Sequence, residues 1–242
     1  MARPEMPVGE RMQGARSISL RDGVLRIKSA EIMLNLRTAC PASMAVLTDE
    51  YYLNGDVVQV ARDLIGKVLY TRRNGELTTG MIVETEAYSH RDDKACHAHL
   101  QRRTRRTEIM FAAGGVAYVY LCYGMHHLFN VVTNREGLAD AVLVRALEPL
   151  EGAGIMAIRR AVPAGDRRLT SGPGNLTMAL GISVADYGKR LGGERMGIQD
   201  AGIAVDATQI VAAPRIGVEY AGEDALKPWR FYLKENPWVS KR

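Results

Sequence analysis

The sequence predicts an α+β protein, a single domain with a curved, mostly antiparallel β-sheet and flanking helices. Two turns support this prediction. Asn74-Gly75 lies between two alternating apolar runs, which is a strong β-hairpin signal, and Tyr123-Gly124 lies between two later runs of the same kind. The predicted strands mostly follow one another directly, and no repeat, low-complexity run or linker divides the chain.

The chain has 242 residues, of which 47% are hydrophobic, and this is enough for a substantial core. Residues 1–45 are expected to form an N-terminal extension, because their apolar residues lack the sustained period of a packed element. The pattern leaves open whether this extension is disordered. Residues 46–242 are expected to form the domain.

The first elements of the domain follow from its turns. A helix is expected over residues 56–64 and is closed by Gly66. The strand 67–72 then reaches the turn at Asn74-Gly75, and its first half is expected to pair with residues 77–85. These three elements place a hairpin at the start of the sheet.

The middle of the chain predicts a second hairpin, a further strand and a helix. Residues 116–121 and 127–133 flank the second turn and are expected to pair. Residues 141–147 form a further strand, and Pro149–Gly152 is expected to open a helix that runs to about residue 160.

The last third returns to short elements. After a loop over residues 161–166, the segment Ser171-Gly-Pro-Gly precedes a short amphipathic helix whose first turn has free backbone amides suited to a phosphate. The strands expected after it are residues 203–206, 210–211 and 230–233.

Bulk composition indicates a protein of the cytoplasm. The three cysteines form no disulfide framework and no CxxC pair, which fits a reducing compartment. No apolar run approaches the roughly 20 residues of a membrane span, so no membrane partner is expected. The formal charge of +5 permits a polyanionic partner without identifying one.

The segment GMIVETEAY, residues 80–88, carries two glutamates in a predicted strand. Side chains alternate across a strand, so Glu84 and Glu86 share one face with Ile82 and Tyr88. Two interpretations remain open at this point. The strand is either an edge strand whose charged face meets water, or one wall of a cleft that holds a catalytic carboxylate.

A basic run and several aromatic residues follow these glutamates. The run HAHLQRRTRRTE holds four arginines, and after it Tyr118 and Tyr120 share one strand face while Tyr123 lies at the turn. Basic residues beside exposed aromatic rings suit contact with a nucleic-acid backbone and stacking on its bases. The alternative is a solvated loop beside a half-buried sheet face.

Histidine and cysteine residues in the same region suggest zinc, but their spacing fits no closed zinc site. The H-x-E and P-C-x-x-C signature of zinc deaminases is also missing. Neither a metal nor another cofactor is expected.

Seven segments carry a family resemblance between Leu47 and Ser240. Taken in order, they resemble the 3-methyladenine DNA glycosylases of the alkyladenine type. That family cuts the N-glycosidic bond of damaged purines after flipping the nucleotide out of the duplex. The resemblance therefore implies double-stranded DNA with damaged purines as the partner, and a monomer is expected. The segments are ARDLIGKVL, GMIVETEAY, RRTRRTEIMF, AYVYLCYGMHHLFNVVT, AVLVRALEPLEG, SGPGNLTMALGI and KPWRFYLKENPWVS.

The resemblance also implies the catalytic residues. Glu86 matches the general base that deprotonates the attacking water, and Arg145 matches the residue that helps to hold this water. A carboxylate at this place also steadies the positive charge that develops on the sugar. Glu84 is then an ion-pairing or structural neighbour.

The base pocket and the DNA contacts follow from the same resemblance. Asn130 matches the position that discriminates against the exocyclic amine of guanine. The resemblance assigns no imine-forming lysine, which favours a monofunctional glycosylase, and Lys94 is the nearest lysine. The remaining assignments are stacking walls at Tyr88, His97 and Tyr120, insertion into the duplex at Tyr123 with Met125 beside it, and backbone contacts at Arg103 and Arg106.

Three positions depart from the family pattern. Arg105 and Thr107 stand where a proline and an asparagine are common, and Asn175 stands where a lysine is common. The first two changes are expected to alter the loop and the pocket edge, and the third removes one phosphate contact. None of them touches Glu86, so catalysis is expected to be retained.

Three alternatives are weighed against this interpretation. A catalytically inactive nucleic-acid-binding module has no need for a carboxylate at Glu86. A helix-hairpin-helix glycosylase would use the Gly-rich turn near residue 172, but the strand-rich pattern opposes it. A carbohydrate glycosidase would use Glu84 and Glu86 together, yet carboxylates on one strand face point the same way instead of flanking a bond.

Overall fold

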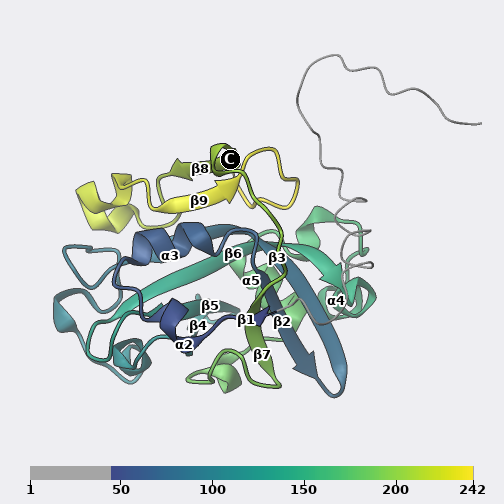
Figure 1. Ribbon diagram of the computed structural model, residues 1–242, viewed down its shortest axis with the longest axis horizontal. Coiled ribbons are helices and arrows are strands. Elements are labelled where there is room, and N and C mark those ends of the chain that lie inside the picture. The colour runs from purple at the N-terminus through teal and green to yellow at the C-terminus, as the bar shows by residue number, and fades with distance from the viewer. Residues whose placement is uncertain (1–44, 242) are drawn as a thin grey trace, which may run out of the picture. The chain divides into compact units, whose positions relative to one another are not determined.

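The computed structural model describes residues 45–241, and all of them belong to one compact unit. Apart from Ala45, the expected N-terminal extension lies outside the described residues. The described chain has the predicted α+β architecture, with a nine-stranded sheet and short helices packed against it (Figure 1). No helix among residues 45–241 is long and apolar enough to cross a membrane.

The sheet is antiparallel at every strand pair that the structure describes, as the sequence predicts. Its order is β1-β7-β2-β3-β6-β5-β4, and β9 pairs with both β3 and β8. The strands are β1 (Ala45–Val46), β2 (Val68–Arg73), β3 (Glu76–Tyr88), β4 (Ala117–Cys122), β5 (His126–Thr133), β6 (Asp140–Glu151), β7 (Met196–Asp200), β8 (Ile210–Ala213) and β9 (Arg230–Leu233).

Both predicted hairpins are present. Asn74 and Gly75 close the first hairpin with φ values of 51° and 81°, which is the left-handed backbone that a tight hairpin turn requires. The pairing with β2 ends at Met81, earlier than predicted, because β3 continues beyond the end of β2 and pairs with β6 and β9 instead. The second hairpin joins β4 to β5, and Tyr123 and Gly124 at its tip are also left-handed.

Four short α-helices accompany the sheet in the described part of the chain. The helix α3 begins after Asp56, whose Oδ1 accepts hydrogen bonds from the backbone amides of Val58 and Gln59 at 3.0 Å each. It ends before Gly66, whose φ of 87° is left-handed, as the sequence predicts. The helices are α2 (Asp49–Tyr52), α3 (Val57–Asp63), α4 (Ala153–Arg160) and α5 (Pro173–Leu180).

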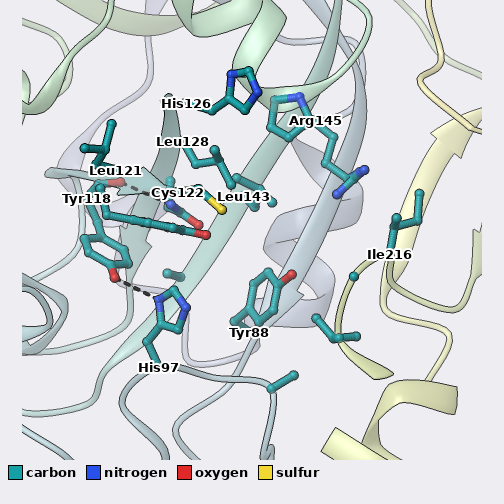
Figure 2. Close-up of a pocket in the computed structure, with 18 of the residues that line it drawn as sticks. Tyr88, His97, Tyr118, Leu121, Cys122, His126, Leu128, Leu143, Arg145 and Ile216 are labelled. Atoms are coloured by element: carbon teal, nitrogen blue, oxygen red, sulfur yellow. Dashed lines mark hydrogen bonds between the residues drawn. The ribbon is translucent and has the colours of Figure 1, made fainter. Parts of the chain in front are cut away.

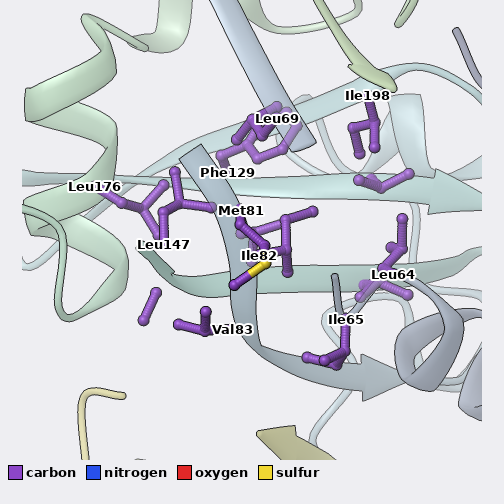
Figure 3. Packing of buried hydrophobic residues seen from close by; sticks show 14 of the residues in the cluster. Leu64, Ile65, Leu69, Met81, Ile82, Val83, Phe129, Leu147, Leu176 and Ile198 are labelled. Carbon is purple, nitrogen blue, oxygen red and sulfur yellow. The ribbon is translucent and has the colours of Figure 1, made fainter. Parts of the chain in front are cut away.

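The main core joins side chains of the sheet to side chains of α3, α4 and α5 (Figure 3). Each fully buried aliphatic or aromatic side chain of this kind contributes about 1.5–3 kcal/mol to the stability of the fold. The buried residues labelled in Figure 3 are Leu64, Ile65, Leu69, Met81, Ile82, Val83, Phe129, Leu147, Leu176 and Ile198.

The strand β3 is central, and the interpretation of its glutamate segment as a solvated edge strand is wrong. Every residue from Thr78 to Ala87 is buried, so both faces of the strand are covered. β6 flanks β3 along residues 79–88, and β9 pairs with it at residues 84–86. At both glutamates, β3 is therefore an internal strand of the sheet and not an edge strand.

Two predicted boundaries are wrong around β6. This strand runs on to Glu151, so Pro149 lies inside the strand and does not open a helix. Proline lacks a backbone donor, and the ladder accommodates it through a register shift between Thr79 and Gly80, where Gly80 faces Pro149. The helix α4 begins only at Ala153, after Gly152 with a φ of 75°.

The predictions near the C-terminus are correct in part. β8 and β9 form where strands were expected, and β9 has the predicted limits. Residues 203–206 form no strand, although Ile203 and Val205 pack against the core. β7 was not predicted, because its segment MGIQD is short and contains a glycine.

Candidate active site

A cavity of about 590 Å³ lies against strands β3 to β6 and is closed by segments 172–175 and 216–220. Figure 2 shows the Tyr88 ring below the Arg145 guanidinium, with Ile216 to the right of both. Glu86, Met125 and Arg103 do not line the cavity, although they were predicted site residues. The predicted residues that do line it are Tyr88, His97, Arg106, Tyr120, Tyr123, Asn130 and Arg145.

Glu86 lies behind the cavity wall and has no exposed surface. Its Oε1 accepts the backbone amide of Ile216 at 2.8 Å. Its Oε2 accepts the Tyr88 hydroxyl at 2.8 Å and Nη1 of Arg145 at 3.2 Å. All three donor residues line the cavity, and because a carboxylate offers about four acceptor positions, one position remains for a further donor.

Burial raises the pKa of Glu86 above its ordinary value, and this is the largest influence on it. The positive charge of Arg145 and the two other hydrogen bonds act in the opposite direction. Burial and the neighbouring Glu86 also raise the pKa of Tyr88, so this hydroxyl stays protonated and donates. A carboxylate with a raised pKa is a better proton acceptor than an ordinary surface glutamate.

Glu84 is an ion-pairing residue, as the sequence predicts. Its Oε1 accepts Nε of Arg145 at 3.1 Å and Nη1 of Arg230 at 3.0 Å, and its Oε2 accepts the backbone amide of Ser240 at 2.7 Å. Two carboxylates that flank a sugar bond would both reach the cavity, whereas neither glutamate lines it and Glu84 is engaged by two arginines and a backbone amide. This arrangement opposes the carbohydrate glycosidase.

An aromatic wall forms the side of the cavity that β4 provides. The ring centroids of Tyr118 and Tyr120 are 5.2 Å apart, and that of His97 is 4.9 Å from Tyr120. His97 Nδ1 and the Tyr118 hydroxyl are 2.9 Å apart (Figure 2). Sequence reasoning placed Tyr118 on the strand face of Tyr120 but gave it no role in the pocket, and this shared face was the available signal.

The His97 imidazole is expected to stay neutral above about pH 5. Burial, together with the charges of Arg106 and Arg102, lowers its pKa to about 4. NMR titration of the ring carbons is expected to give a midpoint near pH 4. Arg106→Gln, which removes one positive charge, is expected to raise this midpoint. A wild-type midpoint at the usual value of about 6.5 would show that the ring is solvated.

Asn130 lies in the wall with its side chain fixed. It is 3% exposed, and its Nδ2 donates to the carbonyl oxygen of Tyr118 at 3.2 Å. This hydrogen bond crosses the β4–β5 ladder. Asn130 also lines the cavity.

The tip of the β4–β5 hairpin projects into solvent beside the cavity. Tyr123 is 87% exposed and Met125 is 67% exposed. The amide of Met125 donates to the carbonyl oxygen of Cys122 at 3.1 Å, which closes the turn. Together with Leu121, the side chains of Tyr123 and Met125 give the tip of the hairpin an exposed apolar surface.

The basic loop is ordered by its own side chains. Thr107 Oγ1 donates to the carbonyl oxygen of Arg102 at 2.8 Å, so the departure at this position stabilises the loop from within. Arg103 stacks over Phe111 at 3.9 Å, and Arg106 lies over Tyr120 at 5.3 Å.

A second cavity, of about 560 Å³, shares His97, Arg106 and Tyr220 with the first. It also takes in Lys94 and Arg102, which sequence reasoning did not assign to a DNA contact.

The segment around Ile216 is part of the site and was not predicted. It is held by Arg215, which donates from Nη1 and Nη2 to the two oxygens of Asp93 at 2.7 Å each, with both side chains fully buried. Arg215 also donates to the carbonyl oxygen of Ala87 at 2.8 Å and stacks over Tyr88 at 4.8 Å. No local pattern links residues that are 122 positions apart, so the sequence carried no signal for this pair.

No group of three or more histidine, cysteine, aspartate or glutamate side chains among residues 45–241 is arranged to hold a metal ion. The nine-stranded sheet also excludes the all-helical alternative for the Gly-rich turn, because Gly172 leads into the single helix α5 beside the sheet.

Comparison with known proteins identifies relatives that are similar over most of this chain. A protein of Chlamydia abortus is 43% identical over 189 residues, which cover 78% of this chain and 98% of the relative. One of Bacillus cytotoxicus is 43% identical over 198 residues, 78% of this chain and 97% of the relative. One of Methanocella arvoryzae is 46% identical over 199 residues, 82% of this chain and 98% of the relative. All three are predicted 3-methyladenine DNA glycosylases.

The family model of methylpurine-DNA glycosylase (MPG) matches residues 51–237, which is most of the chain and includes every residue that lines the cavity. The match also covers Glu86, Arg215 and Asp93. The chain therefore belongs to the methylpurine-DNA glycosylase family and is a DNA glycosylase, an enzyme that hydrolyses the N-glycosidic bond of a base in DNA.

Proposed function

We propose that this enzyme flips alkylated or deaminated purines out of duplex DNA and hydrolyses their N-glycosidic bond with a water activated by Glu86, which starts base excision repair. The observation that carries the proposal is the place of Glu86. It is a fully buried carboxylate with a raised pKa, one free acceptor position and three hydrogen-bond donors that all line an aromatic cavity. An inactive binding module would have no use for such a group.

The reaction needs one proton acceptor when the base is cationic. Water attacks the anomeric carbon of the sugar and gives a proton to Glu86. The electron pair of the carbon–nitrogen bond leaves with the base, so cationic 3-methyladenine departs as a neutral molecule. Arg145, which lines the cavity and contacts Glu86, is placed to hold this water by a hydrogen bond from its guanidinium. The negative charge of Glu86 also stabilises the positive charge that develops on the sugar.

The cavity suits a flat purine base that has been flipped out of the DNA duplex. Its aromatic wall offers stacking on Tyr88, Tyr120 and the neutral His97, and electron-rich rings attract a cationic base. The same rings stack on a neutral deaminated purine, which leaves less readily because it carries no positive charge. Asn130 is fixed where it would exclude the exocyclic amine of guanine, since its amide group cannot swing away from the Tyr118 carbonyl without losing a buried hydrogen bond.

Tyr123 is proposed as the side chain that fills the gap left by the flipped nucleotide. Tyr123→Ala is expected to lower the flipped fraction by roughly 10- to 100-fold, since stacking of an aromatic ring on a base contributes about 1–3 kcal/mol. The measurement is the fluorescence of ethenoadenine in duplex DNA, which rises when the base leaves the stack. Tyr123→Phe keeps the ring and is expected to flip the base. Equal flipping by the alanine variant would assign the insertion to another residue, with Met125 as the next candidate.

The basic residues around the cavity are proposed to hold the DNA backbone. Arg106 lies at the boundary of the two cavities, and Lys94 and Arg102 extend the positive charge into the second one. Arg103 has its guanidinium over Phe111 and would contact phosphate from the rim. Lys94 does not line the aromatic cavity, which supports a monofunctional enzyme that leaves an abasic site uncleaved.

The proposal is tested by the release of base from four duplexes that are identical except for one damaged purine. The purines are 3-methyladenine, 7-methylguanine, ethenoadenine and hypoxanthine. Release of 3-methyladenine without strand cleavage is expected. Slower release is expected for 7-methylguanine, whose exocyclic amine meets Asn130, and for hypoxanthine, which carries no positive charge. Strand cleavage that borohydride traps as a covalent complex would contradict the monofunctional mechanism. Release of none of the four would overturn the proposed substrate class.

A further inference from the structure

Glu84 is fully buried behind the cavity and makes its hydrogen bonds to other groups of the protein. Both of its oxygens are used, by Arg145 and Arg230 on one side and by the Ser240 amide on the other. Neither Glu84 nor Arg230 lines the cavity. Burying a carboxylate is expensive, so its presence calls for a role that an apolar side chain would not fill.

Among residues 45–241, Arg145 is the only cavity-lining residue that both glutamates bind. Its Nε donates to Glu84 at 3.1 Å and its Nη1 donates to Glu86 at 3.2 Å. A guanidinium is a rigid plane, so fixing Nε also fixes the direction of Nη1. Glu84 therefore determines where Arg145 meets Glu86.

The C-terminal end of the chain completes the arrangement. Glu84 accepts the backbone amide of Ser240, and Arg230 donates from Nη1 to the carbonyl oxygen of Lys241 at 2.7 Å. The Ser240 hydroxyl lies 3.5 Å from Nη2 of Arg145. The contact of the Ser240 amide with Glu84 ties this part of the chain to a strand 156 positions earlier.

The four charged groups balance. Glu84 and Glu86 are 0% exposed, Arg230 is 5% exposed and Arg145 is 7% exposed. Two carboxylates and two guanidinium groups sum to zero when Glu86 is ionised. Loss of Glu84 would leave a net positive charge beside Glu86 in a region that water does not screen.

We propose that Glu84 is a positioning residue. Together with the backbone of Ser240 and Lys241, it holds the Arg145 guanidinium at the place where it contacts Glu86 and can orient the attacking water. The inference rests on the proposed role of Glu86 as the base. Glu84 acts through Arg145 and touches neither the substrate nor the water.

The arrangement predicts a change in the pH dependence of the reaction. The negative charge of Glu84 raises the pKa of Glu86, and the positive charge of Arg145 lowers it. Removing the charge of Glu84 therefore lowers the pKa of Glu86, and the acid limb of the rate profile, where the base becomes protonated, moves to lower pH. Titratable groups from several elements face Glu86. They are Glu84 and Tyr88 on β3, Arg145 on β6, Arg230 on β9 at the position paired with Glu86, Tyr120 on β4, and Arg215, which precedes Ile216.

The experiment is single-turnover release of 3-methyladenine from methylated duplex DNA, measured from about pH 5 to about pH 9. The cationic base keeps its charge over this range, so the acid limb reports a group of the enzyme. Glu84→Gln is expected to lower the plateau rate by roughly 10- to 100-fold and to move the acid limb to lower pH. Ser240→Pro, which removes the amide donor without touching a charge, is expected to lower the plateau and leave the acid limb in place.

Asp186 provides a matched control. It is a buried carboxylate that binds two arginines, Arg73 and Arg195, and it makes no hydrogen bond with Glu84, Glu86 or Arg145. Asp186→Asn is expected to lower the melting temperature, as Glu84→Gln does, and to leave the acid limb in place.

The outcomes separate this inference from the proposed function. An unshifted acid limb with a wild-type plateau in Glu84→Gln would overturn the inference, and so would the same loss of rate in Glu84→Gln and Asp186→Asn without a shift. If Glu84→Gln does not fold, an unchanged plateau in Ser240→Pro overturns it. Full activity in Glu86→Gln would instead overturn the proposed base, whatever the Glu84 variant does.

Discussion

Replacing Glu86 with glutamine is expected to abolish base release while DNA binding is retained. The amide keeps the size of the side chain but cannot take a proton from water, and general-base catalysis contributes about 10²–10⁴-fold to the rate. The loss is expected in the chemical step and not in binding, because Glu86 accepts the proton of the water but does not line the cavity that would hold the base. The two measurements are single-turnover release of 3-methyladenine and the dissociation constant for damaged duplex DNA.

Glu148→Gln is the control for this variant. Glu148 is another buried glutamate of the sheet, it is held by Asn236 at 2.8 Å, and it does not line the cavity. Its replacement is expected to leave base release at the wild-type level. If Glu86→Gln kept release within about tenfold of wild type, the base would be a different group. If it lost DNA binding together with release, Glu86 would contribute to binding and the proposed chemistry would lose its support.

Replacing Asp93 with asparagine is expected to give the largest loss of stability. Asp93 and Arg215 form a fully buried pair with two parallel hydrogen bonds of 2.7 Å. Removing one partner of such a pair leaves an uncompensated buried charge and costs about 3–5 kcal/mol of unfolding free energy. For a chain of this length, that equals a fall in the melting temperature of about 10 °C, which calorimetry measures.

The exposed pair of Asp49 and Arg190 provides the comparison. Their side chains are 61% and 59% exposed, so Asp49→Asn is expected to cost less than about 1 kcal/mol. Because Arg215 precedes Ile216, whose amide binds Glu86, the Asp93 variant is also expected to release base more slowly below its melting temperature. Equal melting temperatures for the two variants would show that the pair at Asp93 does not fix this segment.

Local turn chemistry made several elements predictable. Asn74-Gly75 and Tyr123-Gly124 set their hairpins through backbone angles that a few residues determine, and Gly66 ends α3 for the same reason. These effects act over about five residues and need no partner elsewhere in the chain. The prediction of a strand over residues 203–206 was wrong, because an apolar alternation also fits a loop that packs against the core. The sequence does not show whether a partner strand is available for pairing at this place.

The family resemblance named most of the residues of the candidate site, and the structure showed which of them line the cavity and which lie outside it. Seven of the ten residues that it named line one cavity, while Glu86 lies behind the wall and Met125 and Arg103 lie outside it. Alternation placed both glutamates on one face, but it does not show how deeply that face is buried. Their burial follows from distant parts of the chain that contact the two carboxylates, namely the Ile216 amide, the Arg230 side chain and the Ser240 amide.

The sequence by itself determined the fold class, both hairpins and the family, because turn residues, strand alternation and ordered motifs are local properties of the chain. Only the tertiary structure decided that Glu84 and Glu86 are enclosed, and that Ile216, Arg230 and Ser240 complete their hydrogen bonds. These partners lie 130 to 156 positions away. Contacts over such distances depend on strand order and register, which arise when the whole sheet is assembled and leave no periodic signal in the chain.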